Sequence, residues 1–224
     1  MTFSLVARCA RTGQFGVAAV TAVPAVGKLL THAAAGAGAV ATQARVNPYL
    51  GIDGLNLLRQ GLSAEAVHAA LLTTDPAIRF RQFAVIDREG RTATFTGEAC
   101  LDWCGSLQRD GFSAQGNRLA GAHVLTRTAE RFEAMPDEAL ADRLLEALAE
   151  GVAAGGDAKG EVSATVYVMG TEDYPLWDIR VDHHPEPITE LRRLHQVFRE
   201  KVVPEIKTMP TRENPAGEEG EVPI

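Results

Sequence analysis

The second residue of the chain could do chemistry on its own. Met1 is followed by Thr2, and a side chain this small favours removal of the initiator methionine. The freed α-amine would titrate with a pKa of about 7.7–8, so part of it is unprotonated at neutral pH. Beside the threonine hydroxyl, it can act as general base for that nucleophile. Thr2 is therefore either the reactive group of an enzyme or only the start of an edge strand.

The stretch SAQGN, residues 113–117, has the residue types of an oxyanion site. Asn117 can supply a side-chain N–H, and Gly116 can let backbone donors converge on one point. A Gly-Asn pair is also common in simple turns. The spacing alone favours the turn, and the oxyanion role is the alternative.

Asp157 lies in the glycine-rich stretch AGGDAKGEVS, directly before a strand-like run. One interpretation is an Asx turn in a loop that needs glycine. The other is a carboxylate held at the end of a sheet, where the glycines let a substrate approach.

Other motifs are weaker. GAGAVA matches a dinucleotide-binding pattern but runs directly into the strand-like AVATQA, so tight packing explains its small residues and no cofactor is expected. Four residues of types that bind metals lie near the end of a late strand, namely Asp178, Asp182, His183 and His184. A polar strand end explains them, and no metal is predicted. No G-x-S-x-G is present, which argues against an α/β-hydrolase. A Ser-His-Asp triad stays open, because triads converge in space and not in spacing.

Composition limits the class of protein. A chain of 224 residues, 46% hydrophobic, is typical of one globular domain. The net charge of −7 argues against nucleic acid or an anionic membrane as partner. Three cysteines, an odd number, favour a reducing compartment. No targeting segment or long apolar run is visible, so we expect a cytoplasmic protein.

The elements that must position these residues follow from periodicity. Strands are predicted in TFSLVAR, GQFGVAAVTAV, GAGAVATQARV, both arms of the hairpin RQFAVIDREGRTATFTG, GFSAQGN, VSATVYVMG and LWDIRVD. Helices are predicted in DGLNLLRQG, AEAVHAALLTT after a Ser63 cap, 121–134, 137–151 and PITELRRLHQVFREKV. A loop is expected from Glu98 to Asp110. Strands early and late with helices between them predict a layered α+β domain over residues 1–203. The Pro-, Gly- and Glu-rich residues 204–224 are expected to be a mobile tail.

At this point the chain resembles a known family. MTFSLVAR, PAVGKLLTHAAAGAGAVATQARVNPYLGIDGLNLLRQGLSAEA, FTGEAC, GFSAQGN, AGGDAKG and VDHHPEPITELRRL are together similar to the bacterial family called domain of unknown function 1028. The family looks like a member of the N-terminal nucleophile (Ntn) hydrolase superfamily. That resemblance implies a four-layer αββα sandwich, with two stacked antiparallel sheets and helices outside.

The resemblance also implies roles for particular residues. Thr2 would be the nucleophile that opens the first strand, Asn117 an oxyanion donor, and Asp157 an amine-orienting or substrate-binding group. Gln43, Glu98 and Gly116 would be pocket residues. Two departures from the family pattern put specificity in doubt, because Cys9 follows Arg8 where the family usually has Asp, and Val162 precedes Ser163 where Gln is frequent.

The sequence therefore predicts a hydrolase of a small amide, peptide-like or cyclic-amide metabolite. The predicted partner is a small-molecule substrate, and a homo-oligomer is expected. The alternative is a non-catalytic binding or assembly protein on the same fold.

Overall fold

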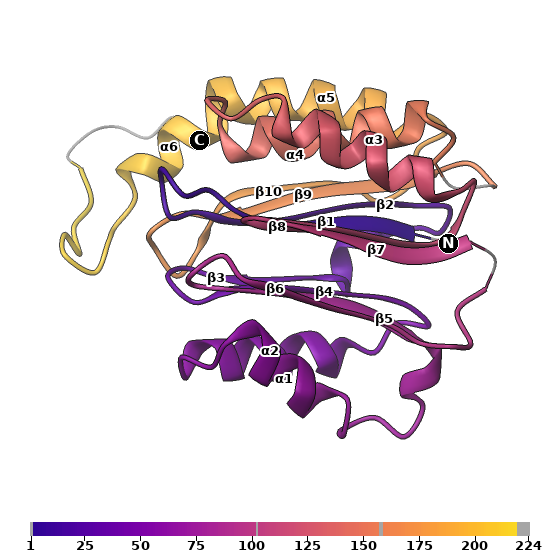
Figure 1. The fold of residues 1–224 in the computed structure, drawn as a ribbon. Coiled ribbons are helices and arrows are strands. Elements are labelled where there is room, and N and C mark those ends of the chain that lie inside the picture. The colour runs from indigo at the N-terminus through magenta and orange to yellow at the C-terminus, as the bar shows by residue number, and fades with distance from the viewer. Residues whose placement is uncertain (1, 102, 157–158, 219–224) are drawn as a thin grey trace.

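Two antiparallel sheets lie face to face between two layers of helices (Figure 1). The computed structural model describes residues 2–101, 103–156 and 159–218. One sheet has six strands in the order β10-β9-β2-β1-β8-β7, and the other has four in the order β3-β4-β5-β6. This arrangement confirms the predicted α+β, four-layer αββα fold.

The six-stranded sheet consists of β1 (Thr2–Arg8), β2 (Phe15–Thr21), β7 (Trp103–Arg109), β8 (Phe112–Leu119), β9 (Ser163–Met169) and β10 (Pro175–Val181). The four-stranded sheet consists of β3 (Thr31–Ala34), β4 (Gly38–Ala44), β5 (Arg81–Asp87) and β6 (Thr92–Thr96). The helices are α1 (Pro48–Arg59), α2 (Ala64–Leu71), α3 (Ala122–Glu133), α4 (Leu140–Ala153), α5 (Pro187–Val197) and α6 (Val203–Thr208). No described helix is long and apolar enough to cross a membrane.

The period of two in β1 assigns its side chains to two different layers. Phe3 and Leu5 belong to the core under α3, α4 and α5, whereas Val6 belongs to the core between the two sheets. Because side chains alternate along a strand, Thr2 and Ser4 face the second sheet together with Val6. Thr2 is thus placed inside the sandwich and not on its helical surface.

The layer between the sheets has an apolar end and a polar end. The apolar end is built mainly from small and branched side chains, namely Val6, Val17, Ala19, Ala33, Ala39, Ala41, Ala84 and Ile86. Such small residues let the two sheets approach closely. The same strands carry Ser4, Gln43 and Gln82 further along, all of them buried. The chemistry of the layer therefore changes along its length.

Two strands were missed by the sequence prediction. The expected loop from Glu98 to Asp110 is wrong for its second half, because residues 103–109 form β7 and pair with β8. Strand β3, only four residues long, pairs with β4. β7 lies at a sheet edge and is largely half-exposed, so its sequence lacks the apolar alternation that marks an inner strand.

The last helix is longer than predicted. A π-helical turn at residues 198–202 joins α5 to α6, which continues past Pro204 to Thr208. Proline has no N–H to donate, and a π turn is one way for a helix to absorb that loss. The chain after α6 contacts the turn before β10: the carbonyl of Pro210 accepts from the Tyr174 hydroxyl (3.0 Å), and Arg212 pairs with Asp173. Mobility of the tail stays a prediction.

Candidate functional site

Thr2 begins β1, which lies between β2 and β8 near the middle of the six-stranded sheet. Its Cα is paired with that of Thr21 on β2 and with that of Asn117 on β8. β1 therefore begins in the inner part of the sheet (Figure 1). Thr2 is the start of an inner strand, so its interpretation as an edge-strand residue is wrong.

The Thr2 hydroxyl is buried and already oriented. Its Oγ1 lies 3.0 Å from the Oγ1 of Thr21, and either hydroxyl can be the donor. The whole residue is only 7% exposed. Among the described residues the contact with Thr21 is the hydrogen bond of the hydroxyl, and it leaves a lone pair for attack because each hydroxyl oxygen has two acceptor positions.

Asn117 lies beside Thr2 on the neighbouring strand. Its Nδ2 donates to Oε1 of Gln82 at 3.0 Å, and the residue is 3% exposed. An asparagine amide has two N–H groups, and this contact uses one of them. The geometry is compatible with the predicted oxyanion role, which stays a prediction.

A network of buried amides and hydroxyls holds these residues in place. Gln43 Nε2 donates to Oε1 of Gln82 at 2.8 Å and lies 3.4 Å from the carbonyl oxygen of Thr2. Ser4 Oγ donates to Oε1 of Gln43 (2.5 Å) and accepts from Nε2 of Gln115 (2.6 Å). Buried polar groups that are satisfied in this way fix one geometry. The network ties the first residue of β1 to both sheets.

The sequence-predicted site residues fall into three groups. The structure brings Thr2, Asn117 and Gln43 together, and the carbonyl of Gly116 joins them by accepting from Gln82 at 2.8 Å. Glu98 is instead exposed on the turn after β6. Asp157 lies outside the described residues. The substrate roles predicted for Gln43 and Gly116 stay predictions, and the hydrogen bonds of both described here are to other residues of the protein.

Four residues of this network were missed by sequence reasoning: Ser4, Thr21, Gln82 and Gln115. A signal was present in the pattern. Ser4 and Gln115 each stand two positions from a predicted site residue on the same strand, and so on the same face. A polar side chain at an inward position of an apolar strand is the informative exception.

A pocket of about 360 Å³ opens at this end of the sandwich. Its described lining is Ala44, Arg45, Phe80, Ala99, Cys100, Leu101, Asn117 and Arg118. Asn117 connects the pocket to Thr2, because the two residues are strand partners. Burial raises the pKa of the Cys100 thiol, and the nearby Cys104 adds to that effect. Cys100 is therefore a poor candidate for a thiolate nucleophile.

The backbone of Arg45, which lines the pocket, is held in place through a buried carboxylate and its arginine partner. Asp75 Oδ2 accepts from Arg81 Nε and from Asn47 Nδ2, both at 2.7 Å. The hydrogen bond from Arg81 is the main cause that lowers the pKa of Asp75 to about 2. Arg81 also donates from Nη1 to the carbonyl of Arg45 (2.5 Å). The charged pair thus fixes the backbone that follows β4.

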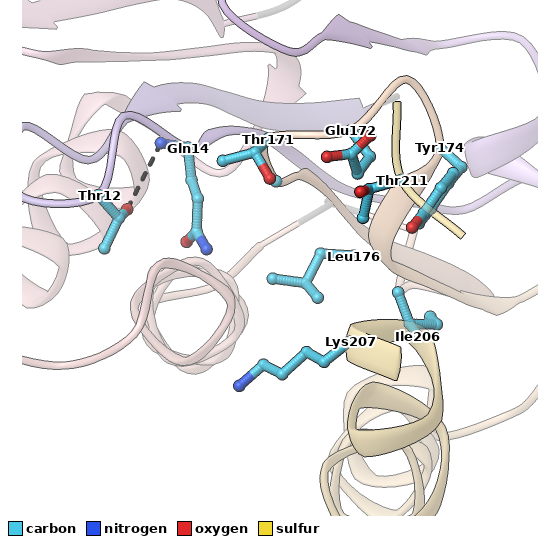
Figure 2. A pocket seen from close by; sticks show the side chains of 10 residues that line it. Thr12, Gln14, Thr171, Glu172, Tyr174, Leu176, Ile206, Lys207 and Thr211 are labelled. Atoms are coloured by element: carbon cyan, nitrogen blue, oxygen red, sulfur yellow. Dashed lines mark hydrogen bonds between the residues drawn. The ribbon is translucent and has the colours of Figure 1, made fainter. Parts of the chain in front are cut away.

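A second pocket has a volume of about 240 Å³ (Figure 2). Its lining includes Thr12 and Gln14 from the β1–β2 turn and Lys207 from α6. That turn is at the other end of a seven-residue strand, roughly 20 Å from Thr2. Figure 2 shows Gln14 and Leu176 facing this pocket, with Lys207 at its border. The distance separates it from the cluster around Thr2.

Metal chemistry finds no support in the residues that the structure describes. Within them, no group of three or more His, Cys, Asp or Glu side chains is placed to hold an ion. The functional groups gathered around Thr2 are hydroxyls and amides, and such groups position substrates and donate hydrogen bonds.

Comparison with known proteins gives a family and a close structural relative. The model of the family of unknown function DUF1028 matches residues 2–191. A crystal structure of protein SPO2555 from Silicibacter pomeroyi, assigned to the same family, is 31% identical with a TM-score of 0.90, over 98% of this chain and 97% of that chain. Anbu, an ancestral beta-subunit from Yersinia bercovieri, matches at 11% identity and a TM-score of 0.42, over 93% of this chain and 98% of that one. No curated protein matches this chain.

Proposed function

We propose that this chain, which belongs to the DUF1028 family of unknown function, is a hydrolase of a small amide with Thr2 as its nucleophile. One observation carries the proposal. Thr2 opens an inner strand, its hydroxyl faces the polar end of the layer between two sheets, and its strand partner Asn117 lines a pocket. The family resemblance seen in the sequence implies that the nucleophile of an Ntn hydrolase is the first residue of such a strand.

The reaction begins when Met1 has been removed. The Thr2 α-amine then takes the proton of the Thr2 hydroxyl, directly or through a water, as Oγ1 bonds to the amide carbon. The oxyanion accepts from Asn117 and from backbone N–H groups. The amine returns the proton to the leaving nitrogen as the C–N bond breaks. Water then cleaves the ester, which restores the hydroxyl and releases the acid.

The neighbours of Thr2 supply orientation and not a second base. Thr21 holds the hydroxyl at 3.0 Å, and Gln43 lies 3.4 Å from the Thr2 carbonyl. Because one residue supplies nucleophile and base, the mechanism needs no histidine. Within the described part of the chain, the side-chain hydrogen bonds to Thr2 come from Thr21 and Gln43, and neither is a histidine.

The test combines mass spectrometry with a covalent probe. Intact mass should show that Met1 is absent and that Thr2 carries a free amine. An uncharged β-lactone should then acylate Thr2 once per chain, and Thr2→Ala should abolish labelling. Thr171→Ala, a change at an exposed threonine, is the matched control and should label normally. A retained Met1, an acetylated amine or full labelling of Thr2→Ala would contradict the mechanism.

A non-catalytic binding or assembly protein is the second candidate, and one observation favours it. The side-chain amides of Gln43 and Gln82 donate hydrogen bonds to other residues of the protein, so part of the polar cluster already has partners without a substrate. Such a protein should not react selectively at Thr2. A small-molecule ligand, a homo-oligomer and a cytoplasmic location stay predictions under both functions.

A further inference from the structure

The pocket beside Asn117 contains two of the three non-glycine residues with positive φ in the described chain. These are Ala44 at 66° and Arg118 at 55°, and the third is Ala25 at 61°. A left-handed conformation costs a residue with a Cβ about 1–2 kcal/mol. Backbone strain of this kind clusters at sites of function. Its concentration in one pocket indicates that the pocket wall has a purpose beyond folding.

Each of the two strained residues directly follows a buried amide residue near the end of its strand. Ala44 comes after Gln43 on β4, and Arg118 comes after Asn117 on β8. The left-handed turn at Ala44 is followed by Arg45, which lines the same pocket. Each strand therefore supplies a buried amide to the site and then an arginine to the pocket.

Two cationic groups line the pocket. Arg45 and Arg118 line it, and none of its described lining residues is acidic. Neither guanidinium forms an ion pair with another described residue, whereas Arg81 and Arg91 each pair with a buried carboxylate. The Arg45 guanidinium lies 5.6 Å from the centroid of the Phe80 ring, which limits where it can point.

The other residues that line the pocket indicate which class of anion it would bind. The other described lining side chains are apolar or weakly polar, apart from Asn117: Ala44, Phe80, Ala99, Cys100 and Leu101. No lysine or hydroxyl side chain is among them. A guanidinium matches a planar carboxylate with two parallel hydrogen bonds. The same fork of N–H groups also binds phosphate, so the apolar remainder of the lining, which suits an acid with an apolar body, is what favours a carboxylate.

We infer that Arg45 and Arg118 bind a carboxylate of the substrate, so that the amide cleaved at Thr2 belongs to a small acid with an apolar body. An N-acyl amino acid or a short peptide-like acid has this chemistry, and about 360 Å³ accommodates it. The inference rests on the proposed function for its catalytic half. The carboxylate site itself is defined by the pocket and can be tested without turnover.

The experiment measures binding to a chain that cannot react. Thr2→Ala is titrated by calorimetry with N-acetyl-L-leucine and with its neutral analogue N-acetyl-L-leucinamide, and then with the same pair built on phenylalanine and alanine. The acids should bind ten- to hundred-fold more tightly than the amides, as expected for charge-assisted hydrogen bonds. That preference should weaken as salt is added.

Arginine variants assign the preference to this pocket. Arg118→Gln and Arg45→Gln, each added to Thr2→Ala, should each remove most of it. Arg88→Gln changes the net charge equally at an exposed position on the β5–β6 turn and should preserve it. Two separate arginine variants keep the test valid if one of them fails to fold.

Several outcomes would overturn the inference. These are equal binding of acids and amides, no measurable binding by any acid, or an equal loss in Arg88→Gln. Inorganic phosphate binding more tightly than every acid, with the same arginine dependence, would replace the carboxylate by a phosphate. The β-lactone test separates this inference from the proposed function. Labelling without acid preference refutes the carboxylate site alone, and acid preference without labelling refutes the nucleophile alone.

Discussion

Replacing Asp75 by asparagine should remove a measurable, pH-dependent part of the stability of this protein. The Asp75 carboxylate is buried and accepts hydrogen bonds from Arg81, Asn47 and the backbone N–H of Ala77. These bonds are made to the charged form, and they hold its pKa at about 2 against an ordinary value of 3.8. Asparagine keeps the size of the side chain and loses the charge.

The magnitude follows from linkage between proton binding and folding. A difference of about 1.8 units, at about 1.4 kcal/mol per unit, corresponds to about 2 kcal/mol of unfolding free energy. Since the folded pKa is depressed, the unfolded chain takes up the proton first as pH falls. The contribution of Asp75 is therefore complete above about pH 5 and is lost progressively between pH 4 and pH 2.

The assay is urea denaturation followed by tryptophan fluorescence, at pH 7, 5, 4 and 3. Asp75→Asn should be less stable than the wild type by about 2 kcal/mol at pH 7, and the gap should narrow from pH 4 downward. Asp173→Asn is the control, because Asp173 has an arginine partner as well but is exposed on the surface. Little change is expected there. An equal gap at every pH, or an equal effect in the control, would refute the reasoning.

Two further substitutions test the polar cluster and the packing beneath it, both by urea denaturation. Gln82→Leu should lower the unfolding free energy by about 2–4 kcal/mol, because buried partners such as the carbonyl of Gly116 lose their hydrogen bond. Its control is Gln108→Leu at an exposed position of β7, which should have little effect. Gly116→Ala should cost about 1–3 kcal/mol, because a Cβ there would lie 2.4 Å from Cδ1 of Leu119. Gly105→Ala is its control, since the nearest atom to that Cβ would be 3.3 Å away. If a variant and its control lose the same unfolding free energy, the argument for that variant is contradicted.

Much of the fold could be predicted because periodicity reports which side of an element is buried. The alternation in TFSLVAR placed Phe3 and Leu5 on one face of a strand, and the structure has them in the core under α3 and α4. The hairpin around Asp87 was visible because turn residues separate two alternating runs. Such signals are local, so one sequence is sufficient to reveal them.

The composition of the site was less accessible because it depends on register between distant segments. Gln43 and Gln82 meet because β4 and β5 pair with those two residues opposite each other. Thr2 meets Asn117 by the pairing of β1 with β8, which are separated by more than half of the domain. Local patterns cannot reveal which strands become neighbours. The residue types of SAQGN made Asn117 a candidate and the resemblance supplied Gln43, whereas Gln82 and Thr21 had no comparable signal.

The two ends of the layer between the sheets suggest why the polar residues are there. At one end alanine and valine side chains bring the sheets together through apolar packing. The same solution at the other end would avoid the desolvation of several buried amides. The chain instead places Ser4, Gln43, Gln82 and Gln115 there, all satisfied and all within one network around the first residue of β1. Packing of the two sheets does not require such a network, whereas holding Thr2 in one position does, and so the polar end supports the proposed role of Thr2 as nucleophile.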